Sequence, residues 1–159
     1  MMYSYTLFLC VSLLSALTLC DAASKIFENG LTERDKRIIV DKHNEVRRLV
    51  AEGKISGQPK GTNFKQMKYD ETLARAAQQI SNTCIFAHKK VTDNRWQAVG
   101  QNLYTSMSTA FSKGADWSSA IKSWSDEYKF YKYGGPINSK NGHYTQVSLN
   151  MSTLGLLAS

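Results

Sequence analysis

The three histidines are the side chains best suited to proton transfer or metal binding in this chain of 159 residues: His43, His88 and His143. An imidazole exchanges a proton near neutral pH and ligates divalent cations, so each histidine is a candidate for acid–base or metal chemistry. A lone histidine is, however, more often a surface or hydrogen-bonded structural residue than a ligand. Many Asp and Glu residues are candidate partners, so the histidines alone define no site.

No compact motif places these histidines in a known type of active site. Their spacing matches neither a zinc finger nor H-E-x-x-H, and the sequence contains no G-x-S-x-G elbow and no phosphate-binding glycine loop. Motif spacing therefore leaves the function open.

Two helices are predicted before residue 90. The segment Thr32-Glu33-Arg34-Asp35 resembles a capping box, and it predicts a first helix over about residues 33–52 that ends at Gly53. Asp70 is a candidate cap for a second helix. The positions expected to share the buried face of that helix are Leu73, Ala76, Ala77, Ile80 and Cys84.

A third helix is predicted from an aromatic stripe that runs from Trp117 to Tyr131 and stops at Gly134-Gly135-Pro136. Such a stripe is more often core than binding site. Residues 99–104 are predicted to enter a short extended piece. A turn at Asn141-Gly142 and the alternation over residues 143–149 predict a strand.

The N-terminal residues 1–22 are predicted to be a secretory signal peptide. They hold an apolar core followed by small residues, and the apolar region is short for a membrane span. We therefore expect a secreted, extracellular protein that does not span the membrane. A single N-terminal membrane anchor is the alternative, because the segment lacks the usual basic residues before its apolar core.

The formal net charge of +7 is compatible with acidic partners such as anionic lipid, glycosaminoglycan or nucleic acid. Basic residues are nevertheless scattered among acids, with only short pairs such as Arg47-Arg48 and Lys89-Lys90. A solvated basic surface is the simpler interpretation, and secretion argues against a nucleic-acid partner.

Cys84 is expected to be the one cysteine of the mature chain, because Cys10 and Cys20 lie in or at the edge of the signal peptide. A single cysteine is unusual in an oxidising compartment. We expect a buried thiol, since free cysteine is among the most buried residue types. The alternatives are a bridge to Cys20, if cleavage precedes it, and an intermolecular disulfide.

Five motifs occur in a specific order along the chain: His43-Asn44-Glu45-Val46-Arg47, Cys84-Ile85-Phe86-Ala87-His88, Gly100-Gln101-Asn102-Leu103, Trp124-Ser125-Asp126-Glu127 and Gly142-His143-Tyr144-Thr145-Gln146-Val147. In this order they resemble the superfamily of cysteine-rich secretory, antigen-five and pathogenesis-related proteins, called CAP proteins. The similarity covers about residues 32–147 and is greatest to the venom-allergen or antigen-five branch.

The resemblance implies an α+β fold, an α-β-α sandwich with helices on both faces of a small antiparallel sheet. It also implies a central cleft in which His88, Glu127 and His143 approach one another and hold zinc or another divalent cation. Two imidazoles and one carboxylate are a sensible zinc set that leaves a position for water. His43 resembles a structural position of the family rather than a ligand.

Gln101 departs from the family pattern. Many members carry glutamate there, whereas an amide has no negative charge and cannot act as a general base. We therefore expect weaker metal binding and no mechanism with two carboxylates.

The C-terminal part also departs from the family pattern. After Val147 the family continues into further strands, so the resemblance predicts an incomplete CAP domain over residues 32–147 and a divergent tail over residues 148–159. Without further strands, the sheet is expected to expose an edge.

The resemblance favours a secreted, non-enzymatic, venom-allergen-like protein that binds an extracellular lipid, sterol or host protein and modulates host or defence responses. The first alternative is a metal-dependent hydrolase that uses water on an ion held by His88, Glu127 and His143. The second is a truncated isoform with no independent function.

Overall fold

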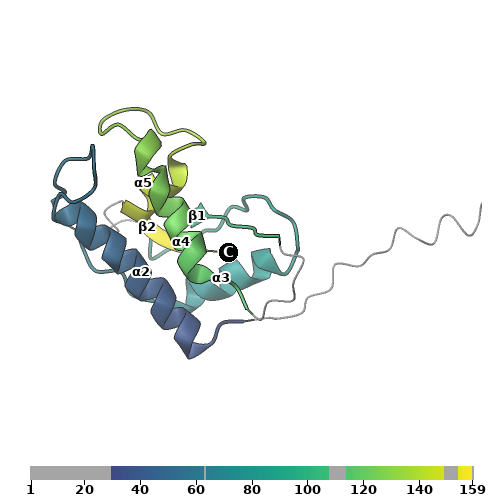
Figure 1. Cartoon of the computed structure of the whole chain (residues 1–159). Coiled ribbons are helices and arrows are strands. Elements are labelled where there is room, and N and C mark those ends of the chain that lie inside the picture. Colours follow the sequence, from purple (N-terminus) through teal and green to yellow (C-terminus); the bar gives the residue numbers. More distant parts are fainter. Residues whose placement is uncertain (1–29, 63, 108–113, 149–153, 159) are drawn as a thin grey trace, which may run out of the picture.

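The computed structural model describes residues 30–62, 64–107, 114–148 and 154–158. The predicted signal peptide, residues 1–22, lies outside this part of the chain. Figure 1 shows helices packed around a short sheet, which has two strands within the described residues. The elements in chain order are α2 (Glu33–Ala51), α3 (Glu71–Ser81), β1 (Ala98–Asn102), α4 (Trp117–Asp126), the 3₁₀ helix η1 (Glu127–Phe130), α5 (Gly142–Ser148) and β2 (Leu154–Ala158).

The first two predicted helices and their caps are confirmed. At the start of α2, the Asp35 backbone N–H donates to Thr32 Oγ1 at 3.1 Å, and the Thr32 N–H donates to Asp35 Oδ2 at 2.9 Å. At the start of α3, Asp70 Oδ1 accepts from the N–H groups of Thr72 and Leu73. These hydroxyl and carboxylate oxygens satisfy amides that have no partner within the first helical turn.

The third predicted helix is present but shorter than its aromatic stripe. Helix α4 ends at Asp126 and continues as η1 to Phe130, and Tyr131 is already extended. The stripe is core where it is helical, since Trp124 is only 2% exposed. Further along, Tyr131 packs its ring 5.9 Å from that of Tyr144.

The sheet consists of β1 and β2 in parallel, in a register that pairs Ala98 with Leu154 and Asn102 with Ala158. The short extended piece predicted at residues 99–104 is confirmed as β1. The antiparallel sheet that we expected is wrong for these two strands. Parallel neighbours need a long crossover connection, and here α4, η1 and α5 lie between them.

Alternation along β1 places helices on both faces of the sheet. Val99 packs against the apolar cluster of Leu73, Ala77 and Ile80 on α3. A Cβ atom on the next residue, Gly100, would overlap the side chain of Gln146 on α5. Because neighbouring strand residues point to opposite faces, α3 covers one face and α5 the other.

Helices α2, α4 and α5 form the layer on the α5 side, so the elements make a helix–sheet–helix arrangement. Ala120, Ile121, Trp124 and Val147 are its buried cluster, and Val46 of α2 packs against them. This confirms a mixed α and β architecture.

The strand predicted over residues 143–149 is wrong, because Gly142–Ser148 is helix α5. Its alternation covered too few residues to separate the two periodicities. The backbone N–H groups of His143 and Tyr144 donate to the Glu127 carboxylate, which satisfies amides at the start of a helix. A contact across 16 residues therefore fixes this element, and no local pattern reports it.

The buried thiol predicted at Cys84 is also wrong, since this cysteine is free and exposed. Helix α3 ends at Ser81, and the chain turns so that the Cys84 N–H donates to the Ser81 carbonyl. Cys84 then takes a φ of 53°, in the left-handed region. The turn carries it away from the face it would share with Leu73.

Candidate functional site

The four residues predicted for the site come from four different segments. His88 lies in the loop after α3, Gln101 in β1, Glu127 at the start of η1 and His143 in the first turn of α5. The structure brings them together as two pairs.

His88 pairs with Gln101. His88 Nδ1 lies 2.7 Å from Gln101 Oε1, and the backbone N–H of Lys89 donates to the same oxygen at 3.2 Å. An amide N–H only donates, so the atom it meets is the side-chain carbonyl oxygen of Gln101. His88 must therefore carry its proton on Nδ1, which leaves Nε2 for other partners.

Glu127 pairs with His143 and also caps α5. Glu127 Oε1 lies 2.7 Å from His143 Nδ1, while Oε2 accepts from the backbone N–H of His143 at 2.9 Å. A carboxylate accepts only, so the shared proton sits on His143 Nδ1. Both oxygens are thus occupied in positioning His143 and its helix.

Asn102 connects β1 to the second pair. Its side chain is 1% exposed, and Nδ2 donates to the His143 carbonyl at 3.2 Å. Since Gln101 is the preceding residue, β1 contacts His88 through one side chain and His143 through the next. The role of Asn102 was missed, although Gly100-Gln101-Asn102 was singled out as a motif.

The predicted three-ligand metal set is not assembled by these contacts. Within the described residues, no three His, Cys, Asp or Glu side chains are grouped so that they could hold a metal ion. The Glu127 carboxylate is used by His143 and by backbone amides. We therefore derive no chemical step through a metal, and zinc at His88, Glu127 and His143 stays a prediction from the sequence.

A surface pocket of about 730 Å³ lies beside the first pair. The loop over residues 88–97 forms one wall and β1 forms the other. Its apolar lining includes Val91, Trp96 and Val99, and its basic lining residues are Lys89 and Lys90. The composition of this loop gave no signal of a pocket, because the pocket depends on how the loop folds back over β1.

Two donors at this pocket have no acceptor. Trp96 Nε1 and Gln101 Nε2 are buried, and neither has a hydrogen-bond partner among the residues that the structure describes. Buried N–H groups without a partner are costly and rare in folded proteins. Both residues line the pocket, but these two nitrogen atoms themselves are covered by protein.

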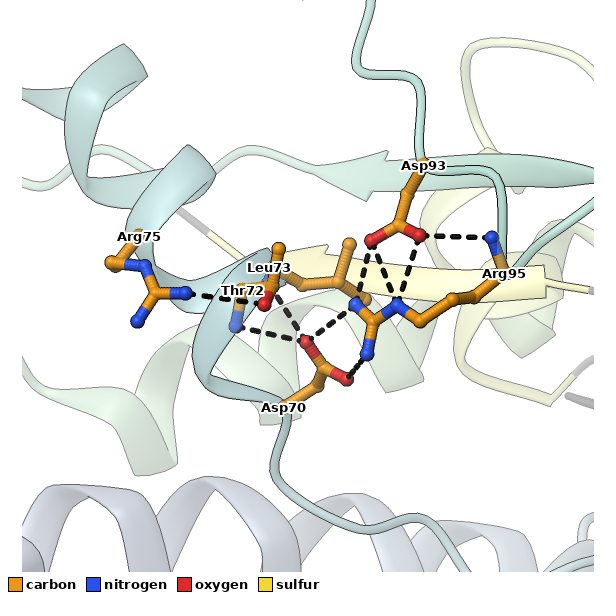
Figure 2. A network of polar contacts seen from close by, with 6 residues as sticks. All are labelled: Asp70, Thr72, Leu73, Arg75, Asp93 and Arg95. Carbon is orange, nitrogen blue, oxygen red and sulfur yellow. Dashed lines mark hydrogen bonds and ion pairs between the residues drawn. The ribbon is translucent and has the colours of Figure 1, made fainter.

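Arg95 holds the pocket loop against α3. Figure 2 shows its guanidinium between the carboxylates of Asp70 and Asp93, with the closest contacts at 2.7 Å and 2.6 Å. Hydrogen bonds from Arg95 lower the pKa of Asp93 to about 2 and lower the pKa of Asp70 as well. The helix cap of α3 and the pocket loop therefore share one charged clamp.

His43 is a structural residue, as the resemblance implied. It is fully buried, its Nδ1 lies 2.7 Å from the Ile39 carbonyl, and its ring centroid lies 6.2 Å from that of Trp124. Burial lowers its pKa to about 4, so the ring is neutral at physiological pH. The Trp124 ring also lies 6.3 Å from His143, which places this core directly behind the second pair.

A helix–sheet–helix arrangement is what the resemblance to CAP proteins implied. Residues 40–155 match the Cysteine-rich secretory protein family, CAP. The chain therefore belongs to the CAP superfamily, in its antigen-5-like branch.

The chain is similar to arthropod proteins that carry antigen-5 names. It is 33% identical to a salivary antigen-5 of Triatoma infestans over 132 residues, which cover 74% of this chain and 54% of the relative. It is 37% identical to a venom allergen 5 of Polybia scutellaris rioplatensis over 128 residues, covering 74% of this chain and 61% of the relative. A venom allergen 5.02 of Vespa crabro is 34% identical over 126 residues, covering 75% and 62%.

The chain spans between half and two thirds of the length of these relatives. Among the helices that the structure describes, none has the length and apolar character needed to cross a membrane.

Proposed function

We propose that the chain is a secreted, non-enzymatic binding protein that holds an amphipathic lipid, such as a fatty acid, in the pocket between residues 88–97 and β1. Its role, by extension from the resemblance, is to modulate host or defence responses outside the cell. The salivary and venom names of its relatives support secretion.

The pocket is the observation that carries this proposal. Its volume is within the range of small-molecule sites, which are mostly apolar with a few placed polar groups. Val91, Trp96 and Val99 suit an aliphatic chain. Lys89 and Lys90 suit a carboxylate, and the one acid of the lining, Asp93, is already paired with Arg95.

The arrangement of the two pairs favours binding over catalysis. Gln101 is neutral and cannot accept a proton as a general base. Glu127 has both carboxylate oxygens committed to His143 and the α5 amides. Sterols and host proteins are the other ligands that the family resemblance suggested.

Titration of the full chain with oleate, followed by displacement of a fluorescent fatty acid, tests the proposal. We expect saturable binding, weakened at least about tenfold by Trp96→Ala, because an aromatic wall of the pocket is lost. Lys68→Glu, an exposed residue absent from the pocket lining, is the charge control and should bind as the wild type does. No saturable binding, or equal binding by Trp96→Ala, would rule the pocket out.

A further inference from the structure

The segment from the end of η1 to the start of α5 exposes three large apolar side chains. Phe130 is 63% exposed, Tyr133 71% and Ile137 61%. We call residues 128–141 the aromatic loop. Figure 1 shows it as the arch at the top of the view, reaching beyond the helices. Large apolar groups gathered on one surface segment mark an interaction site more often than scattered ones do.

The aromatic loop is built to hold this shape. Asn141 is 2% exposed, its Oδ1 accepts from the Asn138 N–H at 2.9 Å, and its Nδ2 lies 3.3 Å from the carbonyls of Phe130 and Pro136. Gln58 Nε2 donates to the Tyr131 carbonyl at 2.6 Å. The buried amide of Asn141 thus connects the two ends of the loop, and the amide of Gln58 connects the loop to the segment after α2.

The inner and outer faces of the aromatic loop are different. Tyr131 turns inward and packs on Tyr144, whereas its neighbours Phe130 and Lys132 are exposed. The backbone of the aromatic loop is therefore held on its inner side, and the exposed apolar groups lie on its outer side.

The aromatic loop is also positively charged. It carries Lys129, Lys132 and Lys140, and no Asp or Glu occurs anywhere in residues 128–159. Lys129 forms a salt bridge with Asp126, in which the nitrogen and oxygen lie 3.5 Å apart. Lys132 and Lys140 make no salt bridge with the residues that the structure describes. Exposed apolar groups thus alternate with unneutralised cations.

We propose that the aromatic loop docks the protein on the surface of an anionic lipid bilayer. Aromatic rings favour the boundary between headgroups and acyl chains, and lysines beside them are attracted to anionic headgroups. A neutral partner would not use the lysines. A sulfated glycan would use the lysines but not Phe130 and Ile137. This surface is separate from the pocket beside β1, so the inference goes beyond the proposed ligand binding and does not depend on it.

Vesicle flotation of the full chain tests the inference. The vesicles are phosphatidylcholine alone, or phosphatidylcholine with about one third phosphatidylserine. We expect binding to the anionic vesicles only, weakened by salt because lysine contacts are screened. Reversal of two lysines, Lys132→Glu with Lys140→Glu, should weaken binding at least about 25-fold, since each lysine near such a surface contributes about fivefold.

The contribution of the exposed apolar side chains is tested with the double variant Phe130→Ser and Ile137→Ser, which should weaken binding to anionic vesicles at least about tenfold. The matched control is Ile85→Ser with Phe86→Ser, which removes two apolar groups of similar exposure, 58% and 64%, outside the loop. All of these positions are exposed, so near-ultraviolet circular dichroism should show an unchanged fold. In Tyr133→Trp, the added indole should shift its emission to shorter wavelength with anionic vesicles.

Several outcomes would overturn the inference. Equal binding to both vesicle types would show that charge has no role in binding. Binding of the Phe130/Ile137 variant at the wild-type level would show that the apolar side chains do not contribute, and would favour a polyanion that contacts the lysines alone. Loss of binding in the Ile85/Phe86 control places the contact elsewhere. Trp96→Ala should float like the wild type, so a failure of the pocket proposal and a failure of this one are distinguishable.

Discussion

The Glu127 carboxylate contacts both the ring and the backbone of His143: Oε1 lies 2.7 Å from the ring Nδ1, and Oε2 lies 2.9 Å from the backbone nitrogen. The contact that orients the imidazole is therefore also the contact that begins helix α5. A change at Glu127 affects ring orientation and helix stability together, and experiments must separate the two.

Glu127→Ala is expected to lower the free energy of unfolding by roughly 1–2 kcal/mol, the usual cost of losing a helix cap. Glu127→Gln keeps an oxygen for the backbone amides and should cost less. Urea unfolding measures both, and Glu45→Ala, which removes an exposed ion pair with Lys42, is the control with an expected change below about 0.5 kcal/mol. A loss in Glu127→Ala no larger than in this control would show that α5 does not depend on the cap.

Arg47 is expected to be one of the most sensitive positions for stability. It is 3% exposed and donates to the carbonyls of Lys65 and Val147, which joins α2 to the following loop and to α5. Arg47→Ala removes the donor to the Val147 carbonyl, which lies in a buried contact, and the donor to the part-buried Lys65 carbonyl, and should cost about 3 kcal/mol or more. Arg48→Ala, at the exposed neighbouring position, should change the urea midpoint little; similar losses in both variants would contradict the assignment.

His43 should make stability depend on pH between about 6.5 and about 4. Burial lowers its pKa to about 4 in the folded state, while the unfolded chain takes up the proton near 6.5. The unfolded state therefore binds more protons in this window, so stability is complete above pH 6.5 and falls as pH drops toward 4, by roughly 3 kcal/mol.

The measurement is urea unfolding at a series of pH values for the wild type and His43→Phe, which has no titrating ring. The difference between their free energies should change across this window, since the acid groups common to both cancel. A constant difference would show that His43 does not titrate in this way.

The Arg95 clamp should be visible in the titration of Asp93. In the wild type the Asp93 carboxyl should titrate near pH 2, and in Arg95→Gln its pKa should return toward about 4. Because the folded-state pKa is lowered, the stabilisation is present above pH 4 and is lost as pH falls toward 2.

Carbon-detected NMR of the Asp93 carboxyl measures this midpoint directly. Arg75→Gln is the matched control, because Arg75 contacts only the Thr72 hydroxyl within the network of Figure 2. An Asp93 midpoint unchanged by Arg95→Gln would mean that the clamp does not form.

The helices were predictable because their signals are local. Thr32 and Asp70 lie next to the amides they cap, and Trp124 belongs to a periodic stripe. Helix α5 was not predictable, since its cap comes from Glu127, which is distant in sequence. The exposure of Cys84 was missed for a different reason, since a local turn after Ser81 ends the helical periodicity before this residue.

The contacts among the predicted site residues were not predictable from the sequence. The family resemblance selected His88, Gln101, Glu127 and His143, and the structure pairs them two by two. Residue types cannot report that Glu127 uses one oxygen for the His143 ring and the other for backbone amides. Trp96 gave no sequence signal, because its place depends on a loop that folds over a strand. Asn141 was predicted only as a turn residue, because its hydrogen bonds across the loop have no local pattern.

The parallel pairing of β1 with β2 also constrains the order of folding. Ala98 pairs with Leu154, so the one pairing of β1 among the described residues forms only after α4, η1 and α5 have been made and β2 has left the ribosome. Contacts between such distant segments form slowly, because the chain must lose the entropy of the long loop first. The unpaired groups of β1 are accessible to chaperones and to other nascent chains during that interval, which makes strand pairing the step at which synthesis of this protein is most easily diverted into aggregates.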